Sequence, residues 1–380
     1  MTTVKSLKPK TSIDDTDNVY YNIKMTNRGI GLFEVANFSV NRTSPIINDP
    51  NQYELAVTRF SVPASNIPIM VWGDQPYQPN PNLPNYNPSG KTDKFSISMT
   101  FDGYTVTKLL QFIPNTTGND FYGNTIWNYQ EFIDIINVAL QECFSNNGGD
   151  GVKDVKPLAP PTTAPFMVYN PEDRLCSIYA ETAYDTGNPS LFLPPTPPPA
   201  PTIQVYFNTA LFTYFPSFQS FEQEELEPLA HQILFKNLFT NNTTYLGNPY
   251  YIMTQEYSTL ALWNDFTTIV FETDSIPVEP EFQPSQNDVT RRIITDFEPF
   301  EDINNRETFQ YSGSGWKRYY DLKSHYPLST IDMRAYWEDR DGQLYPIYIG
   351  LDEALTMKLL FRKKTSLTLE ETFYPDVNDD

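Results

Sequence analysis

Cysteine, histidine and cations are all scarce in this chain. Its 380 residues include two cysteines, Cys143 and Cys176, and two histidines, His231 and His325. This stock is small for a metal site, a reactive thiol or a histidine-based triad, so the sequence disfavours each of these chemistries. Lysine and arginine number 26 against 47 aspartates and glutamates, a net charge of −21, which argues against nucleic acid as the main partner.

Long apolar runs are also missing. No stretch of about 18 apolar residues occurs, so we expect no transmembrane segment. The first 18 residues, MTTVKSLKPKTSIDDTDN, lack the apolar core of a signal peptide. We therefore expect a reducing, soluble compartment, in which a disulfide between the two cysteines is not favoured.

Aromatic residues and prolines are abundant instead. Aromatics make up 15% of the chain, and the 33 prolines outnumber the 16 glycines about two to one. Aromatic side chains favour strands, whereas proline favours stiff turns and loops. Charged residues are only 19% of the chain, too few for a disordered polyanion. The composition predicts a folded β protein with long loops, and two proline-rich loops are expected at 74–90 and 193–201.

Many short segments alternate apolar and polar residues with the period of a half-buried strand. In YELAVTRFSV, the alternation places Leu55, Val57 and Arg59 on one face and Phe60 on the other. In TIDMRAYWE (330–338), every second residue from Ile331 to Trp337 is apolar, which predicts one buried face.

Two strand-like runs, FSISMTF and YTVTKLLQF, flank Asp102-Gly103. This dipeptide readily adopts the positive φ angles of a type I′ turn, so we predict a β-hairpin there.

One long helix is predicted over residues 129–145, with Asn128 as N-cap and Glu131 three residues later. Its apolar residues recur at steps of three and four along one face: Phe132, Ile136, Ala139, Leu140 and Cys143. Cys143 is therefore interpreted as a core residue, and Cys176 likewise. With well over eight strands and one main helix, the predicted fold is all-β: a single jelly roll, or antiparallel β-sandwich, with long proline-rich loops or insertions.

No motif in the sequence carries recognisable catalytic chemistry. The acidic run EQEELE (222–227) lies near His231 without the spacing of a zinc motif, and DRDG (339–342) lacks the remaining ligands of a calcium loop. RGIG and GSGWKR lack the strand-loop-helix frame of a phosphate site. We predict no catalytic, cofactor-binding or metal-binding residues, although a carboxylate pair for glycoside hydrolysis could lie among 47 acids.

Cations gather near the two ends of this acidic chain. They are Lys5, Lys8 and Lys10 at the start and Lys358, Arg362, Lys363 and Lys364 before the tail. Such segments suit docking onto another acidic surface of an assembly, onto a genome or onto lipid, and they equally suit solvated strand ends. The predicted domain organisation is an N-terminal arm over 1–18, one domain over 19–365 and an acidic tail over 366–380.

Several strings, in order, resemble the penton protein, also called the minor capsid protein, of polinton-like viruses, virophages and adintoviruses. They cover most of residues 19–364. The matching strings are YELAVTRFSVP, WNYQEFIDIINVALQ, PFMVYNPEDRL, VYFNTALFTYFPSF, QEYSTLALWNDFTTIVFETDSIPVEPE, ITDFEP and YDLKSHYPLSTIDMRAYWEDRDGQLYPIYIGLDEALTMKLLFRKK.

The resemblance implies a non-enzymatic jelly-roll subunit that forms homopentamers at the fivefold vertices of an icosahedral virion. Its implied partners are further copies of itself, a double-jelly-roll major capsid protein, and internal capsid proteins or a vertex spike. Synthesis is expected in the host or viral-factory cytoplasm, and the seven cations are candidate assembly contacts.

Two other functions stay open at this point. One is a carbohydrate-binding or glycan-processing jelly roll, in which the aromatic residues of MVWGDQPYQPN (70–80) stack on sugar rings. The other is the sole shell protein of a small virus.

Overall fold

The chain forms two compact units. The computed structural model describes residues 17–29, 31–73, 95–112, 124–184, 202–222, 228–235, 241–245, 247–283, 289–298, 308–312, 318–340 and 342–364. One unit comprises residues 1–66, 268–299 and 306–380, and the second comprises 67–267 and 300–305. The span 19–365, treated above as one domain, thus contains two units.

The first unit is built from strands. They are β1 (Asn18–Thr26), β2 (Phe33–Val35), β3 (Asn37–Asn41), β4 (Tyr53–Pro63), β16 (Phe266–Glu272), β17 (Glu281–Gln283), β18 (Val289–Arg291), β19 (Ile293–Phe297), β20 (Thr308–Ser312), β21 (Tyr320–Asp321), β22 (Thr330–Asp339), β23 (Leu344–Pro346), β24 (Tyr348–Gly350) and β25 (Ala354–Lys363), with a 3-10 turn at Pro50–Gln52.

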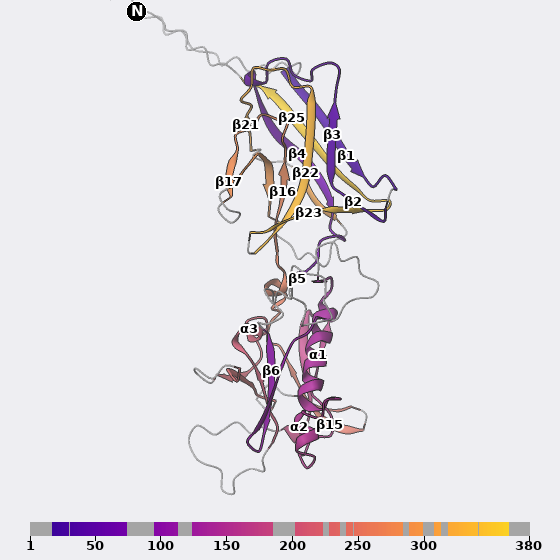
Figure 1. Ribbon diagram of the computed structural model, residues 1–380, viewed down its shortest axis with the longest axis vertical. Helices are drawn as coiled ribbons and strands as arrows, with labels where there is room; N and C mark the ends of the chain where they lie inside the picture. Colours follow the sequence, from indigo (N-terminus) through magenta and orange to yellow (C-terminus); the bar gives the residue numbers. More distant parts are fainter. Residues whose placement is uncertain are drawn as a thin grey trace, which may run out of the picture. The chain divides into compact units, whose positions relative to one another are not determined.

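Two sheets of the first unit pack face to face. One has the order β1-β25-β4-β20 with β21 also on β4, and the other has the order β19-β16-β22-β23 with β3 on β22. Figure 1 shows β1 and β25, from opposite ends of the chain, side by side, and they pair antiparallel. Phe60 of β4 contacts Phe271 and Phe297 of the second sheet, with ring centroids 5.0 and 5.2 Å apart. The predicted antiparallel β-sandwich of the jelly roll is confirmed.

The alternation predicted along β4 is wrong beyond Val57. A β-bulge pairs Lys358 with Arg59 and Leu359 with Val57, so Thr58 is an extra residue and its hydroxyl donates to the Lys358 carbonyl at 3.0 Å. An extra residue reverses the faces of everything after it. Arg59 is therefore exposed, and Phe60 is buried.

The second unit contains the main helix. Its elements are β5 (Met70–Gly73), β6 (Ser96–Phe101), β7 (Tyr104–Leu109), β8 (Asn124–Ile126), α1 (Tyr129–Phe144), α2 (Val152–Val155), β9 (Phe166–Asn170), β10 (Leu175–Glu181), β11 (Gln204–Phe207), α3 (Thr209–Phe212), β12 (Ser220–Glu222), β13 (His231–Ile233), β14 (Asn241–Tyr245), β15 (Asn248–Thr254) and α4 (Leu260–Trp263), with a 3-10 turn at Thr182–Tyr184.

The helix α1 confirms the sequence prediction and organises this unit. The Asn128 side chain accepts from the Glu131 backbone N–H at 3.0 Å, and Glu131 accepts from the Trp127 N–H at 2.8 Å. The first bond satisfies a donor that an α-helix leaves open at its start, and the second ties Glu131 back to the residue before the N-cap. The predicted apolar face is buried against β9, β6 and β7, and Figure 1 shows α1 beside β6.

Two further local predictions are confirmed. β6 and β7 form a hairpin whose turn residues, Asp102 and Gly103, have φ angles of 48° and 74°. Along β22, the residues from Ile331 to Trp337 are buried at every second position.

Both cysteines are free and buried in the core of the second unit, as predicted. Desolvation raises the pKa of each thiol to about 12.

Because both thiols are buried and protonated, we expect no reaction with a thiol reagent at pH 8 in the native chain and two reacted thiols after denaturation. Rapid modification of the native chain would contradict the burial of Cys143 and Cys176.

Trp72 cannot stack on a sugar, contrary to the carbohydrate-binding alternative. It is 0% exposed and packs edge-on against Phe95 and Phe132. The other parts of that alternative, residues 74–80, lie outside the described residues, as do both proline-rich loops, nearly all of the arm and the acidic tail.

Candidate functional site

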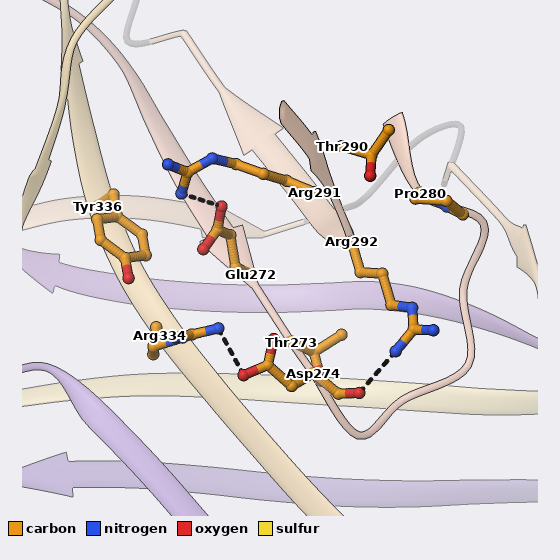
Figure 2. Close-up of a pocket in the computed structure, with 9 residues that line it drawn as sticks. All are labelled: Glu272, Thr273, Asp274, Pro280, Thr290, Arg291, Arg292, Arg334 and Tyr336. Atoms are coloured by element: carbon orange, nitrogen blue, oxygen red, sulfur yellow. Dashed lines mark hydrogen bonds and ion pairs between the residues drawn. The ribbon is translucent and has the colours of Figure 1, made fainter. Parts of the chain in front are cut away.

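A polar pocket of about 430 Å³ lies on the first unit, where β16 and β18 end and β22 passes (Figure 2). Its lining is dominated by charged and hydroxyl-bearing side chains, in contrast to the aromatic core. The lining residues are Glu272, Thr273, Asp274, Pro280, Thr290, Arg291, Arg292, Arg334 and Tyr336.

Strand geometry explains why these residues meet. Because β22 buries Ile331 to Trp337 at alternate positions, Arg334 and Tyr336 point to the opposite face of the sheet. A register shift between Phe271 and Glu272 ends the regular pairing of β16 with β19. Bulges of this kind redirect side chains at the end of a strand.

Asp332 fixes the loop that forms one wall of the pocket. Its carboxylate accepts from the Thr273 hydroxyl at 2.8 Å, the Asp274 backbone N–H at 3.0 Å and the Ser275 backbone N–H at 2.7 Å. The Ser275 hydroxyl in turn accepts from the Asp332 N–H at 2.9 Å. Burial by itself would raise the pKa of Asp332, but the hydrogen bonds from Ser275, Asp274 and Thr273 outweigh it and lower this pKa.

Replacing Asp332 by asparagine is expected to lower the free energy of unfolding by about 1–3 kcal/mol at pH 7, because an amide cannot accept all of these bonds. A carboxyl whose pKa is lowered in the folded state stabilises the fold above its ordinary value of 3.8, and this contribution is lost as the pH falls through the folded value. The difference between the two chains should therefore shrink below about pH 4.

Denaturant unfolding at several pH values measures this difference. The control is Asp134→Asn, since Asp134 is exposed and accepts a bond from Gln130 on the helix surface. A pH-independent difference for Asp332→Asn would contradict the assigned role.

Ion pairs order the arginines of the pocket. Arg291 Nη1 lies 2.6 Å from Glu272 Oε1, and this carboxylate is nearly buried. Arg334 Nη2 lies 2.7 Å from Asp274 Oδ2. Arg292 Nη1 donates to the Asp274 carbonyl at 2.8 Å. Figure 2 shows the two acidic residues between the three guanidinium groups.

The arginines of this pocket suit the binding of an anion. Guanidinium groups are permanently charged donors for carboxylate or phosphate, and they do not transfer protons at ordinary pH. Desolvation raises the pKa of Tyr336, which keeps its hydroxyl protonated. Within the described ranges, no group of three or more His, Cys, Asp or Glu side chains could hold a metal ion.

The four predicted cations on β25 and directly after it all contact other residues of their own chain. Lys358 Nζ lies 4.7 Å from the centre of the Tyr20 ring. Arg362 donates to Glu54 at 2.5 Å and stacks over Tyr319 at 3.8 Å.

Lys363 and Lys364 also lie near acidic residues of their own chain. Lys363 lies 3.8 Å from Asp17, and Lys364 lies 3.0 Å from Asp321. Lys5, Lys8 and Lys10 lie outside the described residues.

Both histidines lie outside the pocket lining. His231 is buried and stacks on Phe212 with ring centroids 4.1 Å apart, while His325 is exposed and lies 3.6 Å from Asp49.

Sequence reasoning missed the arginine pocket. The one local signal of this pocket in the sequence is the dipeptide Arg291-Arg292. Among the described helices, none is long and apolar enough to cross a bilayer.

Comparisons with known proteins agree along nearly the whole chain. Structural protein V19 of Sputnik virophage is 31% identical over 181 residues, covering 43% of this chain and 82% of V19. Protein V18 of the same virophage, which is uncharacterised, is 31% identical over 152 residues, covering 34% of this chain and 84% of V18.

Two solved structures share the fold. A chain in the 3.5 Å cryo-EM structure of the Sputnik virophage aligns with a TM-score of 0.70 and 27% identity, over 92% of this chain and 98% of that one. The crystal structure of the mavirus penton protein aligns with a TM-score of 0.64 and 15% identity, over 91% and 99%. The family model described as Sputnik minor capsid protein V18/19 matches residues 19–363. The chain belongs to this family of virophage minor capsid proteins.

Proposed function

We propose that this protein forms homopentamers at the fivefold vertices of an icosahedral virion and contacts a double-jelly-roll major capsid protein there. The observation that carries the proposal is the family match over residues 19–363, together with the shared fold of the mavirus penton protein. Its role is structural and not enzymatic, and its partners include internal capsid proteins or a vertex spike. Synthesis takes place in the host or viral-factory cytoplasm.

Exposed apolar residues on the first unit support contacts between copies. Leu32 and Leu351 are 65% and 51% exposed, and they flank the paired residues Phe33 and Gly350 of β2 and β24. Contiguous exposed apolar surface marks sites of contact between proteins, and these two leucines lie at neighbouring positions. We therefore place part of the interface between subunits at this β2–β24 edge.

The mass of the purified full-length chain in solution tests this proposal. Analytical ultracentrifugation should give a species with five times the 43.7 kDa mass of the chain. The double variant Leu32→Asp/Leu351→Asp should shift the chain towards monomer, since it buries charge in an apolar contact. Leu158→Asp, at a residue that is 95% exposed in the second unit, is the matched control. A chain that stays monomeric at every concentration would overturn the proposal.

The same proposal assigns assembly contacts to the seven cations named from the sequence: Lys5, Lys8, Lys10, Lys358, Arg362, Lys363 and Lys364. Because Arg362 also pairs with Glu54 and stacks on Tyr319, Arg362→Gln should lower stability by about 1–2 kcal/mol besides weakening assembly. Lys363 is exposed, so Lys363→Gln should affect assembly with little change in thermal unfolding. Normal incorporation of both variants into particles would contradict an assembly role.

A further inference from the structure

The arginine pocket on the first unit has more positive than negative groups in its lining. Three guanidinium groups line it, against the carboxylates of Glu272 and Asp274. Asp332 is not part of the lining, and its carboxylate accepts hydrogen bonds from the Thr273–Ser275 loop. On a chain with a net charge of −21, a pocket of this kind is a local site of attraction for acidic groups.

Donor capacity remains at two of the arginines. A guanidinium carries five N–H donors. Arg334 Nε is buried and has no hydrogen-bond partner among the described residues. Arg292 is bonded to a backbone carbonyl, which leaves its charge without a carboxylate partner in the described part of the pocket. A buried donor without a partner calls for an acceptor, which a ligand in the pocket or a water molecule supplies.

Carboxylates of an acidic peptide fit this site better than a nucleic acid. The volume of about 430 Å³ accommodates a few side chains, and the planar fork of arginine binds a carboxylate through two parallel bonds. Thr290 and Tyr336 add hydroxyl donors to the lining. A polynucleotide would instead have to lie along an acidic body, where its phosphates are repelled.

The chain itself contains a matching segment. Residues 365–380 hold five carboxylates, no lysine and no arginine; the acids are Glu370, Glu371, Asp376, Asp379 and Asp380. The segment follows Lys364 at the end of β25, and at ~3.3–3.6 Å per residue it reaches up to about 55 Å. The other acidic run, 222–227, is tethered at both ends and has a shorter reach.

We propose that the pocket of Arg292 and Arg334 binds the acidic segment 365–380 of a neighbouring copy of this chain. The inference rests on the proposed self-association and names a contact that carries it. Docking of the segment gives Arg292 a carboxylate partner and Arg334 a second one beside Asp274. It turns repulsion between two acidic subunits into a specific attraction.

Binding of a labelled peptide with the sequence of residues 365–380 tests the pocket directly. The receptor is the full chain with its own acids replaced (Glu370→Gln, Glu371→Gln, Asp376→Asn, Asp379→Asn, Asp380→Asn), so that its tail does not compete. Adding Arg292→Gln or Arg334→Gln to this receptor should weaken peptide binding about tenfold or more, measured by fluorescence anisotropy. Adding Arg28→Gln should change binding less than about twofold, because Arg28 is 72% exposed and does not line the pocket.

Equal binding by the Arg28→Gln and Arg292→Gln receptors would overturn the proposal. So would tighter binding of a single-stranded oligonucleotide than of the peptide at the same salt concentration. Circular dichroism of each variant verifies that the receptor is folded, and Arg292→Gln is the milder change because Arg292 donates to a carbonyl.

Mixing two defective full-length variants distinguishes a neighbouring tail from the chain's own tail. One variant carries Arg292→Gln with an intact tail, and the other carries the five neutralised acids with an intact pocket. Each alone should self-associate about tenfold more weakly than the unmodified chain. Their mixture should associate more strongly than either variant alone, since the intact pocket of one variant meets the intact tail of the other. A mixture as weak as the separate variants would place the tail in the pocket of its own chain and overturn the proposal.

Failure of this proposal is distinguishable from failure of the proposed function. If Arg292→Gln and the neutralised tail leave pentamers intact, the pocket inference is wrong and the vertex role stands. If the unmodified chain never forms pentamers, the vertex role fails, whereas the peptide measurement still decides whether the pocket binds residues 365–380.

Discussion

Replacing Phe132 by alanine is expected to lower the free energy of unfolding of the second unit by about 3–5 kcal/mol. Phe132 is 1% exposed and lies on the buried face of α1. Five aromatic rings surround it, with centroid distances of 5.0 to 6.3 Å: Trp72, Phe95, Tyr214, Phe215 and Trp263. Truncation removes the ring and leaves a cavity that this rigid aromatic cluster cannot fill.

Hydrogen exchange with mass spectrometry measures this effect within the second unit. Amides of α1 should lose protection in Phe132→Ala, whereas those of β4 and β25 in the first unit should keep it. Val138→Ala on the same helix is the control, because Val138 is 40% exposed. Equal loss of protection in both units would contradict separate cores.

A substitution of similar expected effect lies in the core of the first unit. Phe60→Ala is expected to cost about 3–5 kcal/mol there, because Phe60 is 3% exposed and joins the two sheets of the sandwich. It also stacks on Tyr311 of β20 with ring centroids 5.4 Å apart. Since the β-bulge at Thr58 brings Phe60 inside, the loss would confirm that the bulge sets the inner face of β4.

Hydrogen exchange with mass spectrometry also tests Phe60→Ala. In this variant the amides of β4, β16 and β25 should lose protection. Val40→Ala on β3 serves as its control, since Val40 is 37% exposed. A variant at Phe60 as stable as this control would show that the side chain does not belong to the core.

Local features of the fold could be predicted from sequence because neighbouring residues determine them. The Asp102-Gly103 hairpin and the cap of α1 at Asn128 depend on a few consecutive residues. The face of Phe60 could not be predicted in this way. It depends on a bulge in the pairing of β4 with β25, which lies about 300 residues later in the chain. No local sequence pattern at Thr58 predicts this bulge.

The pocket illustrates the same limit. Arg292 and Arg334 lie over forty residues apart, and only the pairing of β16 with β19 and β22 brings them together. The cations near Lys364 were visible in the sequence, but their partners were not: Glu54 and Asp321, which pair with Arg362 and Lys364, come from β4 and β21. The positions of these charges along the chain are visible in the sequence, whereas the strand pairing determines which residues they contact.

The position of this chain in the virus particle tests its proposed role most directly. Cryo-electron microscopy of the source particle should show five copies of the chain around each fivefold vertex, each with the β-sandwich of the first unit beside the major capsid protein. A particle whose vertices contain a different protein, or which lacks this chain altogether, would contradict the vertex role.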